Sequence, residues 1–194
     1  MRLTGLLMMP LAMMVAGTSA AAQGRTVEWQ IAAAVLPLPD SMRAGAEVLG
    51  YRTPGGPLVQ LRAGTNPMIC LADDPAVEGY AAHCYHASLA AFMERGRALR
   101  AAGITKRSAV DSARLAEIKA GTLKMPTGPA ALYSLYADSL NFDPKAGRPK
   151  NASKLLSLYL PYSTGASTGI SEMPLTDQPW LMYGGKPWAH LMIQ

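Results

Sequence analysis

Residues 67–89 decide the fold, and they read PMICLADDPAVEGYAAHCYHASL. The apolar run 67–71 indicates a strand, and the turn-forming residues Asp73-Asp74-Pro75 follow it. From Ala82 to Ala102, apolar side chains recur at the spacing of an α-helix, and Gly103 provides a terminator. The stretch therefore predicts a strand and then one long amphipathic helix that packs against it.

The two cysteines of the chain, Cys70 and Cys84, both fall in this stretch. An even number of cysteines in an exported protein predicts a disulfide, here between the predicted strand and the start of the predicted helix. Such a bridge closes a short loop and stabilises the fold by about 3 kcal/mol in the chain-entropy account.

A metal site is the alternative interpretation of the same stretch. His83 and His86 lie three residues apart, a spacing that brings two ligands together on a helix, and Asp73 and Asp74 lie just upstream. His190 near the C-terminus is a further candidate ligand, although its apolar neighbours favour a buried histidine. The spacing does not identify the metal, because it lacks the paired-cysteine and paired-histidine patterns of zinc sites.

The N-terminus has the layout of a secretory signal peptide. Arg2 precedes an apolar run over residues 6–16, and small residues follow as far as Ala22. Cleavage after Ala22 releases a chain that begins at Gln23, and cleavage after Ala20 is the alternative. We expect residues 1–22 to be removed, leaving residues 23–194 as one disulfide-stapled domain in the periplasm or the medium. The apolar run is too short to span a bilayer, and no cysteine lies near the cleavage site to carry a lipid, so we expect no membrane attachment after cleavage.

The rest of the chain predicts several short elements. Thr26 is placed to cap a helix that ends before the prolines at 37 and 39. Alternating or continuous apolar runs predict further strands, and Gly121 ends a second helix. The strands are expected at 46–51, 58–61, 67–71, 132–136, 155–159, 180–183 and 188–193, the first three as a β-meander, and the second helix at 108–120. The predicted fold is α+β, with a mainly antiparallel sheet, one long amphipathic helix packed on it, and a single domain.

The charged residues give a formal net charge of +5, from 18 Lys and Arg against 13 Asp and Glu. This charge is too diffuse to indicate nucleic-acid binding. Arg95, Arg97 and Arg100 lie close together on the predicted long helix but point in different directions, which favours a solvated surface over an anion site.

Gly165-Ala166-Ser167-Thr168-Gly169 matches the Gly-x-Ser-x-Gly motif of serine hydrolases, and Asp177 and His190 follow in the chain order of those enzymes. The motif needs a strand before Ser167 and a helix after it, and the nearby prolines at 161, 174 and 179 oppose both. A serine and glycine loop is the favoured interpretation.

These patterns predict a non-catalytic binding or interaction module, exported and without a cofactor, that binds a small ligand or a protein partner. A metal-binding protein or metal-dependent enzyme that uses His83 and His86 is the alternative, and a serine hydrolase that uses Ser167 is the third hypothesis.

Overall fold

The computed structural model describes residues 25–138 and 141–194, so the predicted signal peptide lies outside the described residues. A mixed eight-stranded sheet runs through the molecule in the order β2-β1-β3-β4-β5-β6-β8-β7. Every neighbouring pair is antiparallel except β1 and β3. The strands are β1 Glu47–Gly50, β2 Val59–Arg62, β3 Met68–Leu71, β4 Tyr80–His86, β5 Ala130–Ala137, β6 Ser153–Tyr159, β7 Trp180–Met182 and β8 His190–Ile193.

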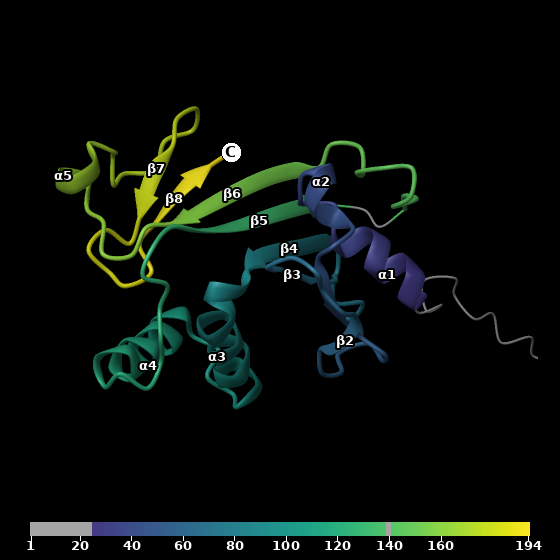
Figure 1. Ribbon diagram of the computed structural model, residues 1–194, viewed down its shortest axis with the longest axis horizontal. Helices are drawn as coiled ribbons and strands as arrows, with labels where there is room; N and C mark the ends of the chain where they lie inside the picture. The colour runs from purple at the N-terminus through teal and green to yellow at the C-terminus, as the bar shows by residue number, and fades with distance from the viewer. Residues whose placement is uncertain (1–24, 139–140) are drawn as a thin grey trace, which may run out of the picture.

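Different helices pack on the two faces of this sheet (Figure 1). On one face, α1 and the segment after it pack on Val48, Cys70 and Cys84 of β1, β3 and β4. On the other face, α3 and α4 pack on Tyr85 of β4 and its neighbours. Figure 1 shows α1 and α2 at one end of the molecule, and α5 with the β7–β8 hairpin at the opposite end. The helices are α1 Val27–Ala34, α2 Asp40–Arg43, α3 Ala90–Ala101, α4 Arg107–Lys119 and α5 Gly165–Thr168, with a 3₁₀ turn at Ala87–Leu89.

The α+β prediction is confirmed, but the single long helix from Ala82 is wrong. Residues 80–86 form β4, in the middle of the sheet, and α3 begins only at Ala90. Sheet pairing overrides the helical spacing here, because β4 hydrogen-bonds to β3 on one side and to β5 on the other. The predicted terminator holds, since Gly103 has a positive φ of 87° and the amide of Ile104 donates to the carbonyl of Leu99 in a Schellman motif.

The predicted β-meander is also wrong in its order. β1 and β2 form the expected antiparallel pair, but β3 crosses back to the other edge of β1 and pairs with it in parallel. Several local predictions agree with the structure, whereas the loop expected at 165–169 contains the short helix α5. Thr26 caps α1, α4 follows the predicted second helix, and β5 to β8 lie at the last four predicted strands.

Cys70 and Cys84 form the predicted disulfide, as directly opposed residues of β3 and β4. Both are fully buried on the α1 face of the sheet. Within residues 25–138 and 141–194, no helix has the length and apolarity needed to cross a membrane.

Candidate functional site

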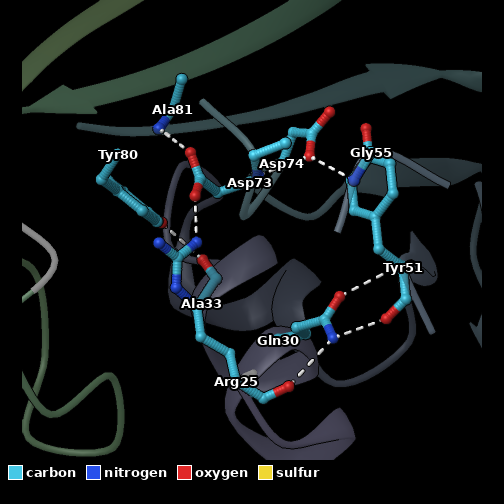
Figure 2. Close-up of polar contacts among 10 residues, drawn as sticks. Arg25, Gln30, Ala33, Tyr51, Gly55, Asp73, Asp74, Tyr80 and Ala81 are labelled. Carbon is cyan, nitrogen blue, oxygen red and sulfur yellow. Dashed lines mark hydrogen bonds and ion pairs between the residues drawn. The ribbon is translucent and has the colours of Figure 1, made fainter. Parts of the chain in front are cut away.

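Asp73, a candidate ligand from the sequence, is used to fasten α1 to the sheet (Figure 2). It is 5% exposed, accepts a hydrogen bond of 2.8 Å from the amide of Ala81, and forms an ion pair with Arg25. Burial raises the pKa of Asp73, whereas the Ala81 amide and Arg25 oppose that rise. The carboxylate therefore has protein partners for both of its oxygens and holds the start of α1.

Asp74 has a similar structural role on the other side of the same turn. Its carboxylate accepts from the amides of Ala76, at 2.9 Å, and Gly55, at 3.3 Å, so it ties the β1–β2 connection to the end of β3. Buried Gln30 completes this corner, because its amide accepts from the backbone N–H of Tyr51 and donates to the Tyr51 carbonyl, both at 2.8 Å (Figure 2). These bonds fix the backbone from which the Tyr51 side chain projects.

The structure does not bring His83 and His86 together. Both lie on β4, where side chains three residues apart point to opposite faces of the sheet. His83 Nδ1 lies 2.9 Å from the hydroxyl of buried Ser134, and burial lowers the His83 pKa. His86 instead caps the 3₁₀ turn, with its Nδ1 2.8 Å from the Ser88 hydroxyl. Among residues 25–138 and 141–194, no three His, Cys, Asp or Glu side chains are grouped to hold a metal ion.

His190 lies in an aromatic cluster far along the sheet from the disulfide. Its ring stacks on Tyr159 with centroids 4.8 Å apart, and its Nδ1 lies 2.8 Å from the carbonyl oxygen of Trp188. A carbonyl oxygen only accepts, so Nδ1 carries the proton in this bond. Burial lowers the pKa of His190, which is consistent with the buried histidine that the sequence favours.

Ser167 completes the capping box of a short helix whose N-cap is Thr164. It lies on the four-residue α5, where its amide donates to the Thr164 hydroxyl and its own hydroxyl accepts from the Thr164 amide. Every hydrogen bond that the described part of the chain gives to the Ser167 hydroxyl involves Thr164.

The three arginines of α3 have three different environments. Arg95 makes a bidentate ion pair with Glu117 of α4, at 2.6 to 2.9 Å, and Arg100 donates to the Gly96 carbonyl of its own helix. Arg97 is half-buried, and its Nη2 lies 3.4 Å from the hydroxyl oxygen of Tyr85. No ion pair in the described part of the chain involves Arg97.

Arg97 faces a cavity of about 600 Å³ between α3 and the β1–β2 hairpin. In Figure 1, α3 and β2 both lie on the same side of β4 and β5. The cavity walls combine small and apolar residues with a few polar ones. The apolar walls are Leu49, Pro57, Leu58, Ala98 and Ala101, and the polar groups are Tyr51, Asp74, Glu94, Arg97 and Arg100.

Two phenols stand next to Arg97 as neutral hydrogen-bonding groups. Burial raises the pKa of Tyr51, and the negative charge of Asp74 raises it further. Burial also raises the pKa of Tyr85. Both hydroxyls therefore stay protonated at neutral pH, and neither provides a counter-charge for the guanidinium.

A second hollow, of about 650 Å³, runs from Asp73 along the ends of β4 and β5 to Ser153. Its charged lining residues are Asp73, Glu78 and Asp138, and Tyr136 forms an exposed wall. The Asp73 carboxylate is already paired with Arg25, so this hollow lacks the half-buried charge without an ion-pair partner that distinguishes the Arg97 cavity.

Of the residues that the sequence singled out, Asp74, Arg97 and Arg100 meet at the Arg97 cavity, and Tyr51 was missed. A signal was present on α3, because Glu94, Arg97, Ala98 and Ala101 follow the i, i+3, i+4, i+7 spacing of one helical face. The two alanines on this face leave room beside the arginine. Comparison with known proteins finds no matching family, no similar curated protein and no similar solved structure.

Proposed function

We propose that this protein is an exported, non-catalytic binding module that holds a small molecule in the Arg97 cavity. The observation that carries the proposal is the cavity itself: about 600 Å³, with apolar walls and a half-buried arginine that has no carboxylate partner in the described part of the chain. Ligand sites in proteins are typically of this size and combine apolar walls with a small number of convergent polar groups.

The rigidity of the walls supports binding without a large rearrangement. One wall is α3, which Arg95 and Glu117 join to α4. The other is the start of the β1–β2 hairpin, which Gln30 and Asp74 fasten to α1 and β3. A preformed site loses less conformational entropy on binding, so a cavity with only a few polar groups still binds a ligand.

The neutral apolar dye N-phenyl-1-naphthylamine tests the proposal. We expect saturable one-to-one binding with enhanced fluorescence, and we expect Ala98→Trp to abolish it, because Ala98 is exposed on a cavity wall and an indole there fills the space. Ala116→Trp is the matched control, since Ala116 is exposed on α4 outside the cavity. Binding that fails to saturate, or that Ala98→Trp leaves intact, contradicts the proposal.

Export is part of the same proposal. Supporting it are the signal-peptide layout of the sequence and the disulfide, since disulfides persist mainly in oxidising compartments. Intact-mass analysis of protein from the periplasm or the medium should give a chain that starts at Gln23 and gains about 2 Da on reduction. Recovery of an unprocessed chain in the cytoplasm with free thiols would contradict export.

A further inference from the structure

We infer that the Arg97 cavity binds a monocarboxylate with an apolar body, and that the guanidinium of Arg97 holds the carboxylate. This inference rests on the proposed small-molecule site and adds the chemical class of the ligand.

The first step is the unmet hydrogen-bonding capacity of Arg97. A guanidinium has five N–H donors, and the structure gives Arg97 one acceptor, the Tyr85 hydroxyl. That contact comes from a tyrosine that is 1% exposed, so it anchors the guanidinium without neutralising it. The remaining donors form a planar fork that matches the two oxygens of a carboxylate.

The second step is the sign and size of the ligand charge. The cavity has two cationic side chains, Arg97 and Arg100, and two acidic ones, Asp74 and Glu94. Glu94 and Arg100 are exposed to solvent, and Asp74 accepts from two backbone amides, so the half-buried charge with unmet hydrogen-bonding capacity is that of Arg97. A cationic ligand would be repelled by Arg97. The second negative charge of a dianion would be repelled by Asp74 and Glu94. A single negative charge fits best.

The third step is the body of the ligand. Leu49, Pro57 and Leu58 from the hairpin face Ala98 and Ala101 from α3 across the cavity. Burying hydrocarbon against these walls strengthens binding by about fourfold for each CH₂ group. An aliphatic or aromatic carboxylic acid would place its hydrocarbon against these walls and its carboxylate against Arg97. The neutral Tyr51 hydroxyl is an additional hydrogen-bonding group on the lining.

A series of ligands with one eight-carbon chain and different head groups tests the inference: octanoate, octyl phosphate, 1-octanol and octylammonium, each titrated calorimetrically and as a competitor of the naphthylamine dye. We expect octanoate to bind at least tenfold more tightly than the other three. Arg97→Gln should reduce octanoate affinity by about tenfold or more, because hydrogen bonds to a charged group are lost. The dye affinity should change little.

Lys119→Gln is the matched control, since it removes one positive charge from the neighbouring helix α4 at an exposed residue that does not line the cavity. It should leave octanoate affinity within about twofold of the original protein. Dye binding with no preference for octanoate, or a preference for the phosphate, alcohol or amine, overturns this inference while the proposed function stands. Absence of binding by the dye and by all four ligands overturns both. An equal loss in the Lys119 and Arg97 variants also overturns the inference, because the effect would then be one of net charge.

Discussion

Gly96→Ala is expected to destabilise the fold, although alanine is the better helix former. Gly96 lies on the buried face of α3, and a β-carbon there would stand 1.7 Å from Nη2 and 2.5 Å from Cζ of Arg114. Arg114 is 7% exposed, so its guanidinium has little free space. To reach an ordinary contact of about 3.4 Å, the guanidinium must move by about 1.7 Å.

That displacement breaks two interactions of Arg114 with Phe92. Nη2 donates to the Phe92 carbonyl at 2.7 Å, and the guanidinium lies 3.9 Å from the centre of the Phe92 ring. Losing a hydrogen bond from a charged donor costs about 1.5 to 3 kcal/mol, and losing a desolvated cation–π contact costs about 1 to 2 kcal/mol. The better helix propensity of alanine returns about 1 kcal/mol. The net loss is about 3 kcal/mol, or about 9 °C in Tm for a chain of this size.

A double-mutant cycle with Arg114→Met, followed by urea denaturation, tests this reasoning. The methionine side chain ends close to the position of Arg114 Nε, 3.2 Å from the added β-carbon, and has no guanidinium to displace. In that background Gly96→Ala should stabilise the fold by up to about 1 kcal/mol. The coupling between the two changes should therefore be about 4 kcal/mol. Stabilisation by Gly96→Ala in the original protein, or an equal effect in both backgrounds, would refute the clash.

Replacing Cys70 and Cys84 together by alanine should lower the unfolding free energy by about 3 kcal/mol, since the bridge joins residues 14 positions apart; an unchanged urea midpoint would contradict this. Burial lowers the pKa of His83 and His190 below the ordinary 6.5, so their contribution to stability is complete above pH 6.5 and is lost as the pH falls below it. Urea midpoints from pH 8 to pH 5 should therefore fall less in a His83→Gln, His190→Gln double variant, and parallel curves would count against the assignment. Thr26→Ala removes the hydroxyl that accepts from the Trp29 amide and should lower the unfolding free energy by about 1 kcal/mol. Thr26→Ser keeps a hydroxyl and should retain most of that stability when the two variants are compared by thermal melting.

Local patterns predicted the elements whose signals are contained in their own residues. The helix Arg107–Lys119 has its apolar spacing and its glycine stop within one short segment, and the strands Ala130–Ala137 and Ser153–Tyr159 are compact apolar runs. The disulfide could also be predicted, because two cysteines allow only one pairing.

Residues 80–86 could not be assigned correctly in the same way, because two periodicities overlap in them. Tyr85 fits the helical spacing that continues through α3, while Tyr80, Ala82 and Cys84 also alternate as one face of a strand. The strand prevails because β3 and β5 lie on either side of it, and their backbone groups hydrogen-bond to it. Those partners lie outside the window in which a helical repeat is recognised, so the choice depends on long-range pairing.

The same change of period explains why the predicted metal ligands separate. A helix would bring His83 and His86 to one side, whereas a strand sends them to opposite faces.

The order of β1, β2 and β3 also depends on long-range pairing. β1 can pair on either edge, and nothing local to 46–71 selects the parallel return of β3 over a meander.

The Arg97 cavity depends on this long-range register, and the disulfide helps to fix it. With Cys70 opposite Cys84, Tyr85 pairs with Ile69 and points to the face that α3 covers, where its hydroxyl anchors Arg97. A slip of one residue between β3 and β4 would turn Tyr85 to the α1 face and remove that anchor. The candidate anion site could therefore not be predicted from three arginines on a helix, because what distinguishes Arg97 from Arg95 and Arg100 is a tyrosine whose direction is set by the pairing of two strands.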